Sequence, residues 1–157
     1  MKAAIDTDVT VRIVSCDAKV IGSLVGGCRV TIRHQVSGEV LARGLHLGGS
    51  GDTEAIMNQP HRRGALIYGT EGTAAFRTTL PLNEPTPVEI TVEGPLAYPQ
   101  ALQRASKTTW LLPGRDIAGE GLLLQLHGFI VDIMTPESVD VFHSSQAVHL
   151  QAGVRLL

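Results

Sequence analysis

The chain has 157 residues, of which 43% are hydrophobic, and this composition fits one domain with a packed core. Thirteen Lys and Arg against 15 Asp and Glu give a net charge of -2, so the composition carries no basic footprint for nucleic acid or anionic lipid. The apolar runs are far shorter than the ~20 residues that cross a bilayer, which predicts no membrane insertion, and residues 1–10 lack the pattern of a signal peptide. The chain is therefore expected to be cytoplasmic. The alternative is that it is the mature form of an exported protein.

Val, Ile and Thr supply 38 residues in short runs separated by Gly, Pro and Asp, which is typical of an all-β protein. Alternation of apolar and polar residues predicts the strands, which in chain order cover 10–14, 28–33, 39–47, 65–68, 73–79, 88–93, 108–112, 122–126, 129–133 and 148–156. In the clearest of them Val88, Ile90 and Val92 point to the core side. The only helical stretches expected are turns at 53–57 and within 99–106.

Two single residues complete the predicted core. Cys28 lies on the apolar side of its strand with Val30 and Ile32, which favours a buried free thiol, while a bridge between Cys16 and Cys28 stays open. Trp110 lies between Thr109 and Leu111 in a strand, which favours a core anchor over a stacking platform for sugar. With six aromatic residues in all, a carbohydrate-binding face is disfavoured.

Residues 48–66 break the strand pattern and predict a long surface excursion that begins with a Gly-rich run. The run lacks the Lys of a phosphate-binding loop. Polar side chains on or beside this excursion are the candidate binding residues: His46, Asp52, Glu54, His61, Arg62 and Arg63. No pair of them has metal-ligand spacing, and the two arginines next to the last histidine disfavour a divalent cation, so no metal or other cofactor is expected.

The end of the chain alternates cleanly, and four of its apolar residues are interface candidates: Val148, Leu150, Val154 and Leu156. Leaving such a face in water costs about 1.5 to 3 kcal/mol per large side chain. The last strand would insert in its own sandwich or add to the edge of a neighbouring subunit. We expect intermolecular packing, because residues 135–145 would carry the strand away from the body.

Three segments, residues 25–32, 37–42 and 69–76, resemble the transthyretin-like sandwiches that include carboxypeptidase regulatory-like domains and collagen-adhesin B-type repeats. The resemblance implies an antiparallel, immunoglobulin-like or transthyretin-like β-sandwich over residues 8–126. Residues 127–157 would be additional strands that complete it, start a second unit or pair with a neighbouring subunit. The hydrolase branch of this superfamily has His-Val-Leu-Asp and Tyr-Arg-Gly-Ser motifs, and residues 14–17 and 154–157 depart from both. Most members implied by the remaining resemblance are stalks, assembly modules or binding modules.

The expected function is therefore a non-enzymatic structural, scaffold or protein-interaction module within an oligomeric assembly. Its partner would be another protein or a second copy of the chain, and not a nucleic acid. A fold by itself does not assign a function. The alternative is a small hydrolase or metal-dependent enzyme that uses residues 46–61.

Overall fold

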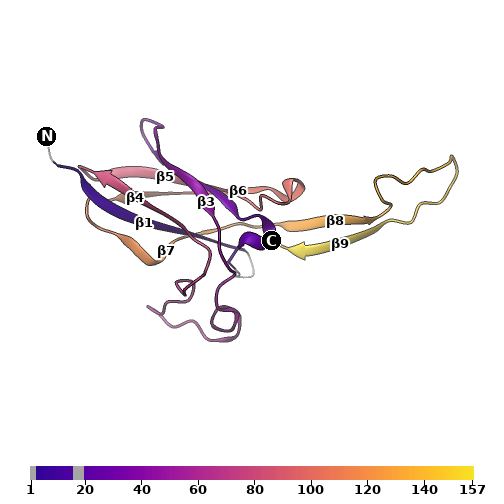
Figure 1. The fold of residues 1–157 in the computed structure, drawn as a ribbon, viewed down its shortest axis with the longest axis horizontal. Helices are drawn as coiled ribbons and strands as arrows, with labels where there is room; N and C mark the ends of the chain where they lie inside the picture. Colours follow the sequence, from indigo (N-terminus) through magenta and orange to yellow (C-terminus); the bar gives the residue numbers. More distant parts are fainter. Residues whose placement is uncertain (1–2, 16–19) are drawn as a thin grey trace.

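The computed structural model describes residues 3–15 and 20–157 and is an all-β sandwich (Figure 1). Strands make up 50% of the structure and helices 8%, which confirms the predicted all-β sandwich and the low helix content. Two sheets face one another, and a separate two-stranded hairpin projects from one end of them.

The smaller sheet has three strands in the order β4–β1–β7, formed by β1 (Ile5–Val14), β4 (Phe76–Leu82) and β7 (Ile117–Gln125). β1 pairs antiparallel with β4 and parallel with β7. The parallel pairing joins strands about a hundred residues apart in sequence, so it is a contact that no local pattern encodes.

The larger sheet is antiparallel and has four strands in the order β3–β2–β5–β6. They are β2 (Cys28–His34), β3 (Val40–His46), β5 (Thr86–Gly94) and β6 (Gln103–Leu111). The core side chains Val88, Ile90 and Val92 are fully buried, as the alternation predicts.

Cys28 is a buried free thiol, and burial raises its pKa to about 12. A Cβ on Gly94 would lie 2.3 Å from the Cys28 sulfur, so a residue without a side chain is required opposite this thiol. Cys16 lies outside the described residues.

Two of the predicted elements are wrong. Residues 65–68 are a loop rather than a strand. The predicted helical turns within 99–106 shrink to a 3-10 turn, η3 (Pro99–Ala101), and β6 begins at Gln103 because the backbone there pairs with β5. Small apolar residues at short intervals fit either structure, and the long-range partner decides between them.

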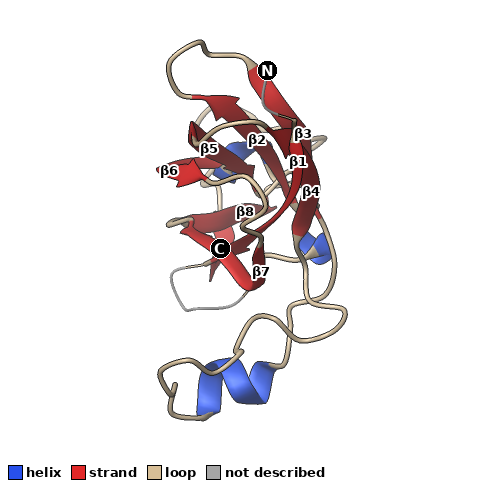
Figure 2. Cartoon of the chain, turned by 90° about the vertical axis from the view of Figure 1, so that its left-hand side faces the viewer, coloured by secondary structure: helices blue, strands red, loops and turns tan. Residues whose placement is uncertain are grey.

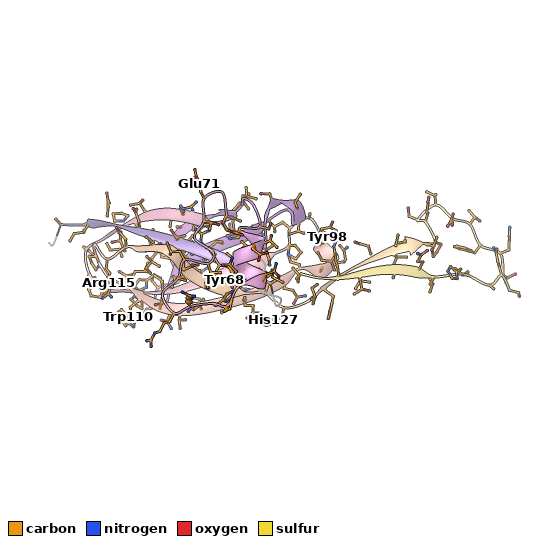
Figure 3. The ribbon with its side chains drawn as sticks, turned by 90° about the horizontal axis from the view of Figure 1, so that it is seen from below. Tyr68, Glu71, Tyr98, Trp110, Arg115 and His127 are labelled. Atoms are coloured by element: carbon orange, nitrogen blue, oxygen red, sulfur yellow. The ribbon has the colours of Figure 1, made fainter. Side chains whose placement is uncertain are left out.

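Trp110 is not a core anchor: its side chain is 62% exposed, and Leu111 beside it is only 1% exposed. Successive side chains of a strand point to opposite faces, so burial of one excludes burial of the other. Figure 3 shows Trp110 at the edge of the molecule, far from the projecting hairpin.

In the structure the excursion extends to residue 75, directly before β4, and it packs against the smaller sheet. A single helical turn, η2 (Glu54–Asn58), forms where a turn is predicted, and Figure 2 shows it to one side of the two sheets. Ile56 and Ala74 are buried against Val14 at the end of β1. The excursion therefore covers part of the outer face of that sheet. The alternation of apolar and polar residues would predict that this face is exposed to water.

The projecting hairpin, called the arm below, consists of β8 (Phe129–Thr135) and β9 (Gln151–Leu156). Within the described residues these strands pair only with each other, and their connecting loop forms the far tip (Figure 1). β9 thus returns towards the body, where the Leu157 N–H donates to the Gly128 carbonyl at 3.1 Å. From the sequence, the last strand is expected to insert in the sandwich or to pair with a neighbouring subunit. Instead it pairs with β8, the strand that precedes it in the chain. The division of the chain into a sandwich domain, residues 8–126, and a C-terminal part, residues 127–157, stays a prediction.

Candidate functional site

The loop candidates do not converge, and His46 belongs to the core. It ends β3 with its side chain fully buried, and its Nε2 accepts the backbone N–H of Ile13 at 3.2 Å. Burial in apolar surroundings lowers the pKa of His46 to about 4. The inward positions of β3 are Ala42, Gly44 and His46, so the strand period contained the signal that this histidine faces the core.

The acidic candidates hold the excursion together locally. The Asp52 Oδ1 accepts the Ala55 N–H at 3.1 Å, and Glu54 Oε2 accepts the Asn58 amide at 2.6 Å. These contacts stabilise the η2 turn.

The basic candidates at the end of that turn are also separate. The His61 Nε2–H donates to the Ile56 carbonyl at 2.9 Å, while Arg62 and Arg63 are exposed. Within residues 3–15 and 20–157, no three His, Cys, Asp or Glu side chains are grouped so as to hold a metal.

Arg12 is the functional candidate that the sequence did not reveal. Only 2% of it is exposed, although it lies between Val11 and Ile13 at a position that the alternation assigns to water. Its Nη1 donates to the carbonyls of Thr73 (3.3 Å) and Ala74 (2.9 Å), and its Nη2 donates to a third, that of Gly119 (3.4 Å). Arg12 thereby ties the end of the excursion to β1 and β7.

A pocket of about 490 Å³ lies beside Arg12 on the outer face of the smaller sheet. The residues that line it include Arg12, Arg77, Thr10, Asp8 and Gly119. Arg77 pairs with Thr10 across the β1–β4 ladder, and Asp8 is the next outward residue along β1. The pocket is thus lined by two arginines, Arg12 and Arg77, and by one acidic residue, Asp8, and the register places both arginines near Thr10.

Glu120 fixes the wall that the excursion gives to this pocket. Its carboxylate accepts the backbone N–H groups of Ile67 and Tyr68, with 2.8 Å from the Tyr68 nitrogen to Oε2. Gly69 follows directly, and a Cβ there would lie 3.3 Å from the Gly119 backbone. The wall is therefore held by the protein's own charge-assisted hydrogen bonds.

The outer face of the larger sheet is basic. Arg29, Arg33, Arg43 and Arg104 surround a depression of about 60 Å³ floored by Thr31 and Thr91. The Arg29 guanidinium pairs with Glu93 at 3.4 Å. The depression is shallow, and its residues come from regular strands, so it fits an ordinary solvated sheet face.

The arm has one apolar face, defined by three cross-strand pairs: Phe129 with Leu156, Val131 with Val154, and Ile133 with Ala152. The five large side chains of this arm face are between 45% and 69% exposed. Val148 and Leu150 are also exposed but precede β9, in the tip loop. Two of the four interface candidates, Val154 and Leu156, therefore lie on the arm face.

The opposite face of the arm is braced by the body. Asp132 accepts the Gln100 amide at 3.2 Å and lies 3.6 Å from the Arg155 guanidinium. That guanidinium lies 4.8 Å from the ring centroid of Tyr98, which Figure 3 shows at the base of the arm. Ile130 is buried on the same face. These contacts brace the opposite face of the arm against the body and leave the arm face exposed.

A mainly apolar hollow of about 600 Å³ lies at the base of the arm. Leu24 and Val25 line one side of it, and Leu156 and Leu157 line the other. Because Leu156 belongs to both, the hollow continues the arm face onto the body.

None of the helical segments in the described parts of the chain has the length and apolar content needed to span a bilayer. In comparisons with known proteins, no family model, no curated protein and no solved structure matches this chain.

Proposed function

We propose that the protein is a non-enzymatic β-sandwich module that associates with a second copy of itself through the arm face. The observation that carries the proposal is an exposed apolar face on a hairpin whose strands pair, among the residues that the structure describes, only with each other. An isolated two-stranded hairpin is at best marginally stable in water, so a hairpin of this kind gains most from a covering surface.

The area of the arm face supports a second copy as the partner. Its exposed fractions correspond to roughly 500 Å², which is in the range of the largest apolar patches on monomeric proteins, and such patches are often binding surfaces. Two such faces packed on one another would bury about 1,000 Å², which reaches the lower limit for a specific interface. Stacking of two identical sheet faces is also compatible with the two-fold symmetry of common homodimers.

The enzyme alternative has less support. His46 is committed to the core, and Asp52, Glu54 and His61 make local bonds within the excursion. We retain a relationship to transthyretin-like binding and assembly modules as part of the proposal, because two facing β-sheets are what that resemblance implies.

The test is light scattering over a concentration series with a Val154→Lys variant. Lys is tolerated on edge strands but would place a charge in the centre of the interface. Each copy would lose about 1.5 kcal/mol of burial, and the two copies together about 3 kcal/mol, which raises the dissociation constant about a hundredfold. We expect a dimer for the natural chain and a monomer for the variant.

The matched control is Val36→Lys, because Val36 is exposed in the turn between β2 and β3 and lies outside the arm. This variant should keep the dimer. A natural chain that stays monomeric at high concentration would contradict the proposal, and so would a Val154→Lys variant that still dimerises.

A further inference from the structure

The pocket beside Arg12 carries an inference that is independent of the arm. Among the described residues two ion pairs form, Arg29 with Glu93 and Arg155 with Asp132, and neither includes Arg12. Its hydrogen bonds all go to neutral carbonyl groups, its Nε has no hydrogen-bond partner, and the nearby Glu120 carboxylate is not within ion-pair distance of it. A buried charge without an ionic partner is costly and attracts a counter-ion.

A second positive charge makes the imbalance larger. Arg77 lines the same pocket and acts electrostatically on Arg12. Burial lowers the pKa of Arg12, the charge of Arg77 lowers it further, and Glu120 partly offsets both. Glu120 itself is occupied by the backbone N–H groups of Ile67 and Tyr68.

We propose that this pocket binds a small organic anion, whose carboxylate or phosphate group lies over Thr10 between Arg77 and Arg12. Guanidinium groups bind both kinds of oxyanion by charge-assisted hydrogen bonds. The volume of about 490 Å³ exceeds what one inorganic ion fills and lies within the range of pockets for small organic ligands.

Asp8 orients the ligand. Asp8 is the next outward residue from Thr10 along β1, with about 7 Å between their Cα atoms, and its Oδ1 accepts the Thr79 hydroxyl at 2.6 Å. A negative charge there repels the anionic group and accepts hydrogen bonds, so it selects hydroxyl or amino groups on the rest of the ligand. The anionic group is thereby confined to the arginine end.

The experiment titrates the full chain with inorganic phosphate and, separately, with citrate, at constant ionic strength, and measures binding by calorimetry. Phosphate should saturate one site per chain if the natural ligand carries a phosphate group, and citrate should do so if the ligand carries a carboxylate. Arg77→Gln should weaken that binding at least tenfold, since one charge-assisted contact is lost. Arg77 is exposed, so this variant should fold normally. Asp8→Asn should strengthen phosphate or citrate binding severalfold, because it removes the repelling charge.

The matched control is Arg43→Gln, which removes the same charge from the outer face of the larger sheet. It should leave the affinity unchanged. Phosphate binding alone identifies a phosphate ligand, and citrate binding alone identifies a carboxylate. Absence of saturable binding by both anions would overturn the proposal, as would an Arg43→Gln variant that weakens binding as much as Arg77→Gln does.

Discussion

Replacement of Arg12 by methionine is expected to lower the free energy of unfolding by about 3 kcal/mol. The variant keeps an unbranched apolar side chain but removes the donors that satisfy the carbonyls of Thr73, Ala74 and Gly119. Each buried acceptor left without a partner costs ~1 to 3 kcal/mol. Part of this loss is offset, because the variant no longer buries a charged group and so avoids its desolvation penalty. A single domain has only ~5 to 15 kcal/mol in total, so the loss would be large.

Equilibrium unfolding in urea measures this effect, with Arg77→Met as the control. Arg77 is exposed and loses the same charge, so its substitution should change stability by no more than ~0.5 kcal/mol. Equal stabilities of the two variants would show that the guanidinium of Arg12 does not hold the excursion to the sheet.

Acidification from about pH 6.5 to about pH 4 is expected to destabilise the protein through His46 by about 3 kcal/mol. The pKa of His46 is about 4 in the folded protein, against 6.5 for an ordinary histidine. Between these values the unfolded chain binds a proton that the folded protein excludes, so stability falls as the pH falls. The full contribution is present above about pH 6.5.

The corresponding variant is His46→Gln, whose amide oxygen would still accept the Ile13 N–H but does not titrate. Its stability should depend less on pH in this window than that of the natural chain, by the amount that His46 contributes. Unfolding by denaturant at several pH values gives the two slopes. Identical slopes would show that another group causes the acid sensitivity.

The candidate site was only partly readable from the sequence. Polar residues near a Gly-rich run drew attention to His46 and the excursion, yet His46 faces the core and Arg12 holds the excursion in place. Arg12 had no distinguishing signal, because a polar residue between two buried ones normally faces water. Its burial depends on residues 73 and 74, about sixty positions away.

The sequence by itself determined the all-β class, the inward faces of strands such as β5, and the presence of an apolar alternation at the end of the chain. These features follow from the period of two along a strand, which is local. Only the tertiary structure decided that β1 pairs with β7, that Trp110 faces outward, and that β9 returns along β8 to form an arm. The period shows that a strand has two different faces, but which neighbour covers each face depends on contacts between distant segments.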